Sequence, residues 1–171
     1  PASFTLGQTT EQQIRQRFGQ PAGQATGQVG DQSVLVLQYT HMEAAGDLIR
    51  ARAMVYTFNG GRLVGFDYSS SFAADQTTFD EAAAKQIKRG QTTRAETLRL
   101  LGAPTGQFIY PSAYAPVPGR RADVYSYTRT ERTSAGATLD QVSRVLALVF
   151  DERGVVVETS LVTTSTARPL Q

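Results

Sequence analysis

The stretch LGQTTEQQIRQRFGQPAGQ, residues 6–24, recurs without a gap as RGQTTRAETLRLLGAPTGQ at residues 89–107. Self-similarity at one fixed spacing indicates a structural unit that occurs twice. The sequence therefore predicts a tandem repeat, with residues 1–75 as the first copy and residues 76–171 as the second. The identical pairs are Gly7/Gly90, Gln8/Gln91, Thr9/Thr92, Thr10/Thr93, Gly19/Gly102, Pro21/Pro104, Gly23/Gly106 and Gln24/Gln107.

Each copy of this stretch encodes a short helix with defined ends. A threonine precedes the helix, and a Gln or Glu three residues later completes a capping box. A glycine suited to a left-handed backbone ends the helix, and the proline that follows prevents its continuation. We therefore expect one capped helix in each copy, bounded by Thr10, Gln13, Gly19 and Pro21 or by Thr93, Glu96, Gly102 and Pro104.

A second helix is predicted in front of the repeated stretch of the second copy. Thr78 and Glu81 have the spacing of a capping box ahead of FDEAAAKQIKRG, and Gly90 ends that segment. Phe4 aligns with Ile87, so the first copy begins partway through the corresponding helix or lacks it. The two copies are therefore expected to be unequal in length.

Strand patterns follow the helices in both copies. Alternation of apolar and polar residues, with β-branched and aromatic types enriched, is typical of strands. The segments FNGGRLV (58–64) and FDERGVV (150–156) carry turn residues at equivalent places and indicate a hairpin in each copy. The predicted strands cover residues 34–40, 52–58 and 62–69, then residues 124–129, 144–150 and 155–162.

The predicted fold class is α+β, with two tandem repeats that each contain one or two helices and a three- or four-stranded antiparallel meander. Successive side chains of a strand point to opposite faces of the sheet. We expect the face with the larger apolar residues to pack against the helices, which would all lie on one side of the sheet. Those residues are Met54, Tyr56, Phe58, Leu146, Leu148 and Phe150.

The composition limits the classes of partner and of chemistry. Seventeen basic and fifteen acidic residues give a formal charge of +2, which does not indicate nucleic acid or an anionic membrane as a partner. The chain has no cysteine and a single histidine, so it excludes disulfides, thiolate metal sites and two-histidine metal sites. No apolar run reaches the roughly 20 residues of a membrane-spanning helix.

Motifs for catalysis and cofactor binding are missing as well. The chain contains neither a G-x-S-x-G nucleophile motif nor a phosphate-binding loop. Gly23, Gly27 and Gly30 are interpreted as a flexible connection, and His41 is expected in a solvent-facing loop. The sequence therefore predicts no catalytic residue, no cofactor and no metal site.

The segment FIYPSAYAPVPGRR, residues 108–121, is the main difference between the copies, because it is longer and richer in proline than its counterpart in the first copy. It is interpreted as a loop. Aromatic and arginine side chains are enriched at protein interfaces, so this loop is the candidate protein-binding site. Packing of its aromatic residues over the sheet is an equal alternative. The candidate residues are Phe108, Tyr110, Tyr114, Arg120 and Arg121.

Two known families share features with this sequence. The pattern I-K-x-G-Q-T followed by L-L-G-x-P, residues 87–104, with the later F-D-x-x-G-x-V hairpin, resembles the BamE (SmpA/OmlA) lipoprotein family. The tandem duplication resembles the architecture of the β-lactamase inhibitor protein family. These resemblances imply an exported bacterial protein in the periplasm, with attachment to the outer membrane through a lipidated cysteine upstream of Pro1.

The resulting functional hypothesis is a non-enzymatic protein-binding module of the bacterial cell envelope, related to outer-membrane assembly factors. Its partner would be another envelope protein, and its oligomeric state stays open. One alternative is a periplasmic protein that binds a cell-wall fragment or a lipid in a groove between the two copies. A protein similar to the β-lactamase inhibitors is a further alternative, and an enzyme is the weakest.

Overall fold

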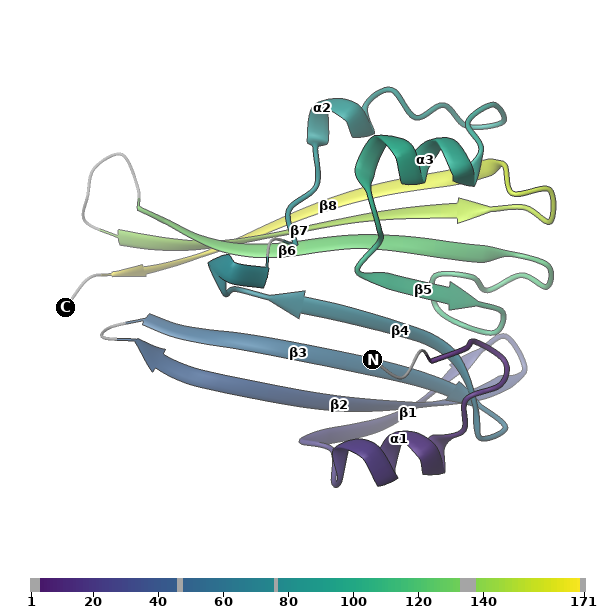
Figure 1. The fold of residues 1–171 in the computed structure, drawn as a ribbon, viewed down its shortest axis with the longest axis horizontal. Coiled ribbons are helices and arrows are strands. Elements are labelled where there is room, and N and C mark those ends of the chain that lie inside the picture. Colours follow the sequence, from purple (N-terminus) through teal and green to yellow (C-terminus); the bar gives the residue numbers. More distant parts are fainter. Residues whose placement is uncertain (1–3, 46–47, 76, 133–137, 170–171) are drawn as a thin grey trace.

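The computed structural model describes residues 4–45, 48–75, 77–132 and 138–169. Its main element is one eight-stranded antiparallel sheet whose strands lie side by side in sequence order (Figure 1). The elements are α1 (Glu11–Phe18), β1 (Gly23–Val29), β2 (Gln32–Ala45), β3 (Leu48–Asn59), β4 (Arg62–Ser70), a 3₁₀ turn (Ala73–Asp75), α2 (Glu81–Ala84), α3 (Arg94–Leu101), β5 (Gly106–Ile109), β6 (Arg121–Arg132), β7 (Thr138–Phe150) and β8 (Val156–Pro169).

The predicted α+β class with two helix-and-meander repeats is wrong, because the structure is mostly β. The helices are only eight, four and eight residues long, and they do not form a helical layer comparable in size to the sheet. The reason lies in their stops. Gly19 and Gly102 adopt positive φ angles of 75° and 78° and end α1 and α3 after about two turns. None of the helices within the described residues is long and apolar enough to cross a bilayer.

The second predicted helix is also shorter than expected, and its cap differs. The side chain of Asp80, not Thr78, accepts hydrogen bonds from the backbone N–H groups of Ala82 and Ala83. The Glu81 carboxylate instead accepts hydrogen bonds from Tyr127 on β6 and Arg144 on β7. The helix ends at Ala84, and the chain continues through turns.

The predicted ends of α1 and α3 are confirmed. Thr10 with Gln13, and Thr93 with Glu96, form complete capping boxes. The backbone around the two helices also makes the same hydrogen bonds at equivalent positions. These include Gly7 N to Leu63 O (2.7 Å) and Gly90 N to Val156 O (2.7 Å), and Leu63 N to Thr9 O (2.8 Å) and Val156 N to Thr92 O (2.9 Å).

All six predicted strands are present, but β1 and β5 were not predicted. The segment interpreted as a flexible glycine-rich connection is the edge strand β1, whose residues pair with β2 from Gly23 to Val29. Most of its residues are exposed, so it has no apolar pattern that sequence analysis could detect. Strand β5 has only four residues, and it places Phe108 in the sheet and not in a loop. It joins β4 to β6 through three residue pairs on one side and four on the other.

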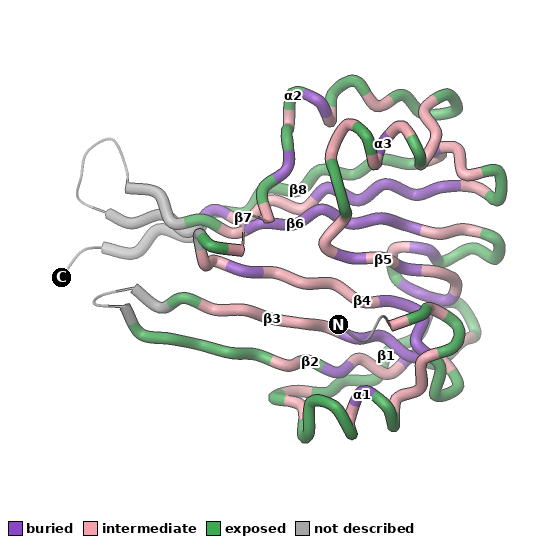
Figure 2. Tube along the Cα trace, in the orientation of Figure 1, coloured by how far each residue is buried: buried purple, intermediate pink, exposed green. Residues whose placement is uncertain are grey.

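Within the described residues, three apolar clusters stabilise the sheet. Buried positions concentrate in the half of the molecule that carries α1 and α3 (Figure 2). The predicted alternation along β3 and β7 is confirmed, since their larger apolar side chains share clusters. One cluster contains Ile14, Leu37, Tyr56, Phe58 and Leu63; the second contains Phe79, Tyr125, Tyr127, Leu146, Leu148, Phe150 and Val156; the third contains Phe108, Ala122, Val124, Ala147 and Val149.

Candidate functional site

The five predicted site residues divide into two groups. Phe108 and Tyr114 pack against each other, with ring centroids 4.7 Å apart, in the cluster that contains Ala122 and Val124. Phe108 is buried, and burial raises the pKa of the Tyr114 hydroxyl. Of the two interpretations of the aromatic loop, packing over the sheet therefore describes these two residues.

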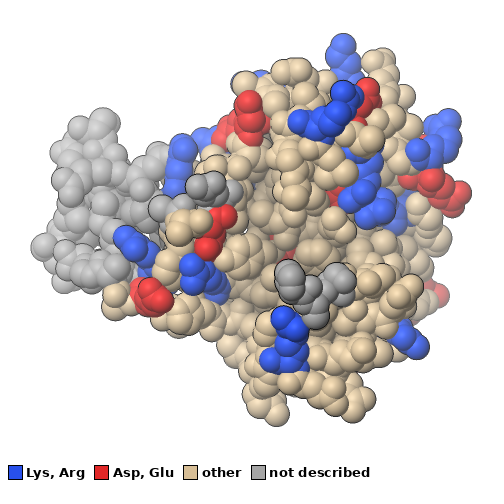
Figure 3. Space-filling view, in the orientation of Figure 1, with Lys and Arg blue, Asp and Glu red and all other residues tan. Residues whose placement is uncertain are grey.

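Tyr110, Arg120 and Arg121 instead line a groove of about 630 Å³ that is open to solvent. The groove lies within residues 94–154, not between the two copies. Lys and Arg side chains gather between α3 and β5 on this side of the molecule (Figure 3). The other lining residues are Arg94, Ile109, Pro118, Gly119, Asp151, Glu152, Arg153 and Gly154.

A buried ion pair forms the base of this region. Arg94, the first residue of α3, donates from Nε and Nη2 to the two carboxylate oxygens of Asp123 on β6, at 2.7 and 3.2 Å. The Asp123 side chain is fully buried. Thr97, also fully buried, donates from its hydroxyl to the backbone oxygen of Arg94 at 2.8 Å. These bonds fix the Arg94 guanidinium at the groove and attach α3 to the sheet.

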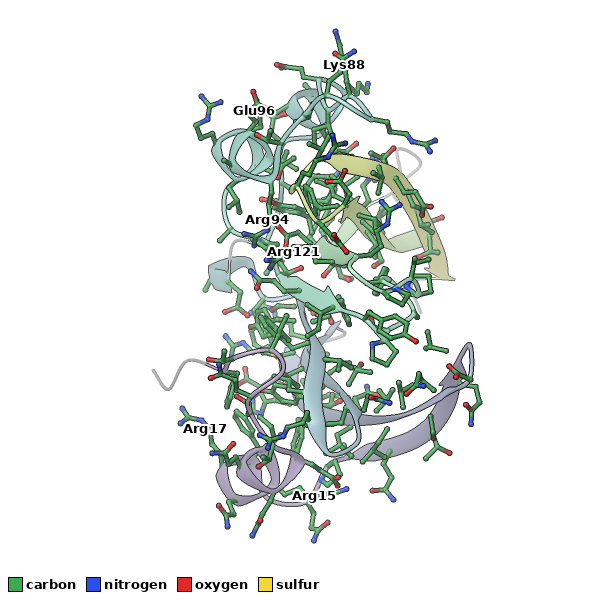
Figure 4. All side chains as sticks on the ribbon, turned by 90° about the vertical axis from the view of Figure 1, so that its right-hand side faces the viewer. Arg15, Arg17, Lys88, Arg94, Glu96 and Arg121 are labelled. Carbon is green, nitrogen blue, oxygen red and sulfur yellow. The ribbon has the colours of Figure 1, made fainter. Side chains whose placement is uncertain are left out.

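Arg121 lies beside Arg94, one from β6 and the other from α3 (Figure 4). Burial and the neighbouring charge of Arg94 lower the pKa of Arg121, while Asp123 opposes the shift. Within the described part of the chain, the buried Nε atom of Arg121 and the buried Nη1 atom of Arg120 have no hydrogen-bond acceptor. The ion pair therefore supplies one carboxylate for two adjacent guanidinium groups, and the Nε donor of Arg121 stays buried without a partner.

The turn between β7 and β8 forms the rim of the groove. Asp151 accepts from the backbone N–H groups of Arg153 and Val155, which lowers the pKa of its carboxyl group together with the charge of Arg153. A Cβ atom on Gly119 would lie 2.2 Å from the Glu152 carboxylate, so that side chain packs directly on the glycine. Gly119 also has a φ of +75°, which favours glycine.

The strand register identifies the first-copy position that corresponds to this ion pair. Asp123 pairs with Gln107 across β5 and β6, and Leu37 pairs with Gln24 across β1 and β2. Gln24 and Gln107 are identical positions of the sequence repeat. Asp123 and Leu37 are therefore equivalent, and both are fully buried.

The same comparison extends to the neighbouring residues. Arg121 pairs with Phe150, as Leu35 pairs with Phe58, and the two phenylalanines are equivalent hairpin residues. We call Arg94, Thr97, Arg121 and Asp123 the polar cluster. Its first-copy counterpart is Glu11, Ile14, Leu35 and Leu37, in the same order. Three of the four first-copy positions are therefore apolar, and the second copy has a fully buried carboxylate, Asp123, where the first copy has Leu37.

Sequence analysis missed the contribution of Arg94, Thr97 and Asp123. One signal was present in the aligned repeat: Thr97 occupies the position of Ile14, which belongs to the apolar face of the first helix. Asp123 gave a second signal, since it precedes a predicted strand and alternates with inward-facing Tyr125. Neither signal shows which of these side chains contact each other in the folded protein.

Other paired ionisable groups of the described residues lie outside the groove, including Arg52, which donates to both carboxylate oxygens of Asp75 at 2.7 and 3.1 Å. His41 is exposed, as predicted, but lies in β2 and not in a loop, where it contacts Glu43 at 3.0 Å. Burial raises the pKa of Asp67 on β4 to about 6, although Thr105 and Ser126 hydrogen-bond to it. Asp67 does not line the groove. Among the described residues, no group of three or more acidic or histidine side chains could hold a metal ion.

Comparisons with known proteins give limited information. No protein family profile matches the chain, and no curated protein matches it, so the resemblance to the BamE family stays a prediction. The fold is similar to the crystal structure of a Streptococcus mutans protein described as a "putative beta-lactamase inhibitor protein". The two share 13% sequence identity and a TM-score of 0.45, over 90% of this chain and 82% of the other.

Proposed function

We propose that this protein is a non-enzymatic binding module that recognises a protein partner through the groove between α3, β6 and the β7–β8 turn. The observation that carries the proposal is the polar cluster. Buried charge is costly unless it is fully paired, and Arg121 is not fully paired. In the first copy, three of the four equivalent positions are apolar.

The shape of the groove favours a segment of protein over a small molecule. Small-ligand pockets bury most of the ligand surface, whereas this groove is open to solvent. It combines an aromatic residue, Tyr110, with the guanidinium groups of Arg120 and Arg121. Tyr and Arg are the residue types that contribute most to binding at protein interfaces.

The proposal includes a location in the bacterial cell envelope. Support comes from the resemblance of residues 87–104 to the BamE family. Attachment to the outer membrane through a lipidated cysteine upstream of Pro1, and a relation to outer-membrane assembly factors, rest on that resemblance. Fractionation of cells that produce the full-length protein tests this part, and recovery in the cytosol would exclude it.

Site-specific photo-cross-linking tests the binding function. A photoreactive phenylalanine derivative at Glu152, which is exposed at the rim, is expected to give a discrete protein adduct in cells. The same residue at Gln28, exposed on the distant edge strand β1, is the matched control. Arg121→Gln should reduce the adduct at position 152 severalfold. Equal adducts at both positions, or an adduct insensitive to Arg121→Gln, would rule out this binding surface.

A second candidate function is the binding of a small ligand. The groove volume of about 630 Å³ lies within the range of ligand pockets, roughly 300–1,000 Å³. Its lining of Tyr and Arg also suits a polar cell-wall fragment. Saturable stabilisation by such fragments, with no protein adduct at position 152, would favour this function. A β-lactamase inhibition assay with the purified protein tests the inhibitor alternative directly.

A further inference from the structure

The polar cluster also indicates the chemical group that the groove binds, an inference that rests on the proposed function. The Nε and Nη2 donors of Arg94 are already occupied, because both donate to the carboxylate of Asp123. Within the described residues, the buried Nε atom of Arg121 and the buried Nη1 atom of Arg120 have no hydrogen-bond partner. Two arginine side chains of adjacent residues, both of which line the groove, therefore have unpaired guanidinium donors.

The charge balance of the groove restricts the ligand further. Four guanidinium groups line it or form its base, and they face three carboxylates, those of Asp123, Asp151 and Glu152. Two of these carboxylates are already paired with arginines, Asp123 with Arg94 and Asp151 with Arg153. The excess is one positive charge. A single negative charge completes the balance, whereas a doubly charged phosphate group would exceed it.

The apolar part of the lining fits the remainder of such a ligand. Ile109, Tyr110 and Pro118 lie on the groove beside the arginines. Guanidinium groups bind carboxylates with two parallel hydrogen bonds, and such charge-assisted bonds are stronger than neutral ones. A carboxylate on a short aliphatic stem would satisfy Arg121 and place its stem on this apolar surface.

We infer that the groove recognises a carboxylate of a partner polypeptide, which binds Arg121 and Arg120. The carboxylate can come from an acidic side chain or from a chain terminus, since both present the same planar pair of oxygen atoms. Its binding would relieve the repulsion between Arg94 and Arg121.

The test follows the backbone N–H resonances of Gly119 and residue 121, which both line the groove, by NMR while small probes are added to the intact protein. N-acetylglutamate N-methylamide carries a side-chain carboxylate, N-acetylalanine carries a terminal one, and N-acetylglutamine N-methylamide is the uncharged control. We expect a saturable shift with one or both carboxylates at roughly millimolar concentration and no shift with the amide. Arg121→Lys should weaken binding at least about fivefold because it removes the planar donor pair.

Arg99→Lys is the matched control, because Arg99 is exposed on α3 and does not line the groove; probe binding to this variant should change by less than about twofold. Absence of saturation, equal binding of the amide, or tighter binding of inorganic phosphate would each overturn the inference. The wild-type titration decides the question even if Arg121→Lys fails to fold. If the cross-link at position 152 still depends on Arg121, the proposed function survives that failure; if it does not, both fail.

Discussion

The α1 end of the sheet (β1–β4) and the α3 end (β5–β8) have the same backbone arrangement, but their buried side chains differ. Both helices start at a threonine capping box, end at a glycine and hydrogen-bond to the following hairpin in the same way. Tyr39 and Tyr125 even donate to equivalent backbone oxygens at the same distance, 3.1 Å. Around α1 the buried positions are apolar, whereas around α3 they hold the polar cluster. The backbone is therefore compatible with either interior, and the difference points to function.

The largest expected effect on stability comes from replacing Asp123 of the second copy with leucine, the residue at the equivalent position of the first copy. Asp123→Leu leaves Arg94 and Arg121 without the buried carboxylate, and removal of one partner of a buried ion pair costs about 3–5 kcal/mol. Urea denaturation should show this loss in the free energy of unfolding. The conservative control is Leu37→Ile, which should change it by less than about 1.5 kcal/mol.

The complete exchange tests whether the polar cluster is needed for the fold. The variant Arg94→Glu, Thr97→Ile, Arg121→Leu and Asp123→Leu should recover most of the stability that Asp123→Leu loses, since buried ion pairs are often replaced by apolar residues without cost. A variant that stays as unstable as Asp123→Leu would show that the cluster is structural.

The stability of the first copy should depend on its buried apolar side chains. Ile14 is fully buried and contacts the cluster that contains Leu37 and Tyr56. Ile14→Ala is expected to lower the free energy of unfolding by about 2–4 kcal/mol, through lost burial and the resulting cavity. Gln12→Ala, on the exposed side of the same helix, should change it by less than about 0.5 kcal/mol. Similar effects at the two positions would contradict the packing described for α1.

The free energy of unfolding should depend on pH through Asp67, which lies at the junction of β4 and β5 where the two ends of the sheet meet. Asp67 pairs with Gly106 where β4 meets β5, and burial raises its pKa to about 6. The folded-state pKa exceeds the unfolded value of 3.8, so the protonated carboxyl stabilises the fold below about pH 4, and this contribution is lost as the pH rises through 6. Asp67→Asn should therefore be more stable than the wild type by about 1–3 kcal/mol at pH 7.5.

At pH 4 the difference between Asp67→Asn and the wild type should be close to zero. Thermal melts at several pH values provide the measurement, and Asp31→Asn, at an exposed turn, is the control. A stability difference that does not change between pH 4 and 7.5 would show that Asp67 does not titrate in this range.

The smallest effects should be equal at the two ends. Thr10→Ala and Thr93→Ala each remove a capping box, and loss of such a cap costs about 1 kcal/mol. Matched chemical denaturation of the two variants measures both losses. A difference of more than about 1 kcal/mol between them would show that the two helices do not make equal contributions.

The sequence predicted local features well because their causes are local. Capping and termination of α1 and α3 depend on residues within one or two turns, and the six longer strands have clear alternation. Strand β1 escaped prediction because an edge strand with exposed polar residues has no such pattern. The α+β class was wrong because cap signals give the position of a helix but not its share of the fold.

The site was predicted in part for a similar reason. Tyr110, Arg120 and Arg121 were found because they are close in sequence, and the structure places them on one groove. Phe108 belongs to the core, since β5 places it opposite Ala122. Arg94 and Asp123 are 29 residues apart on a helix and a strand, and only the register of β5 and β6 brings them together.

The sequential order of the eight strands has a consequence for synthesis. Each strand pairs only with the strands before and after it, so the nascent chain needs no partner that the ribosome has not yet made, apart from the next strand. Folds built from contacts between sequence neighbours form quickly. The Arg94–Asp123 pair can form only after β6 has been synthesised, so the residues of the charged site become available later than those of the first copy.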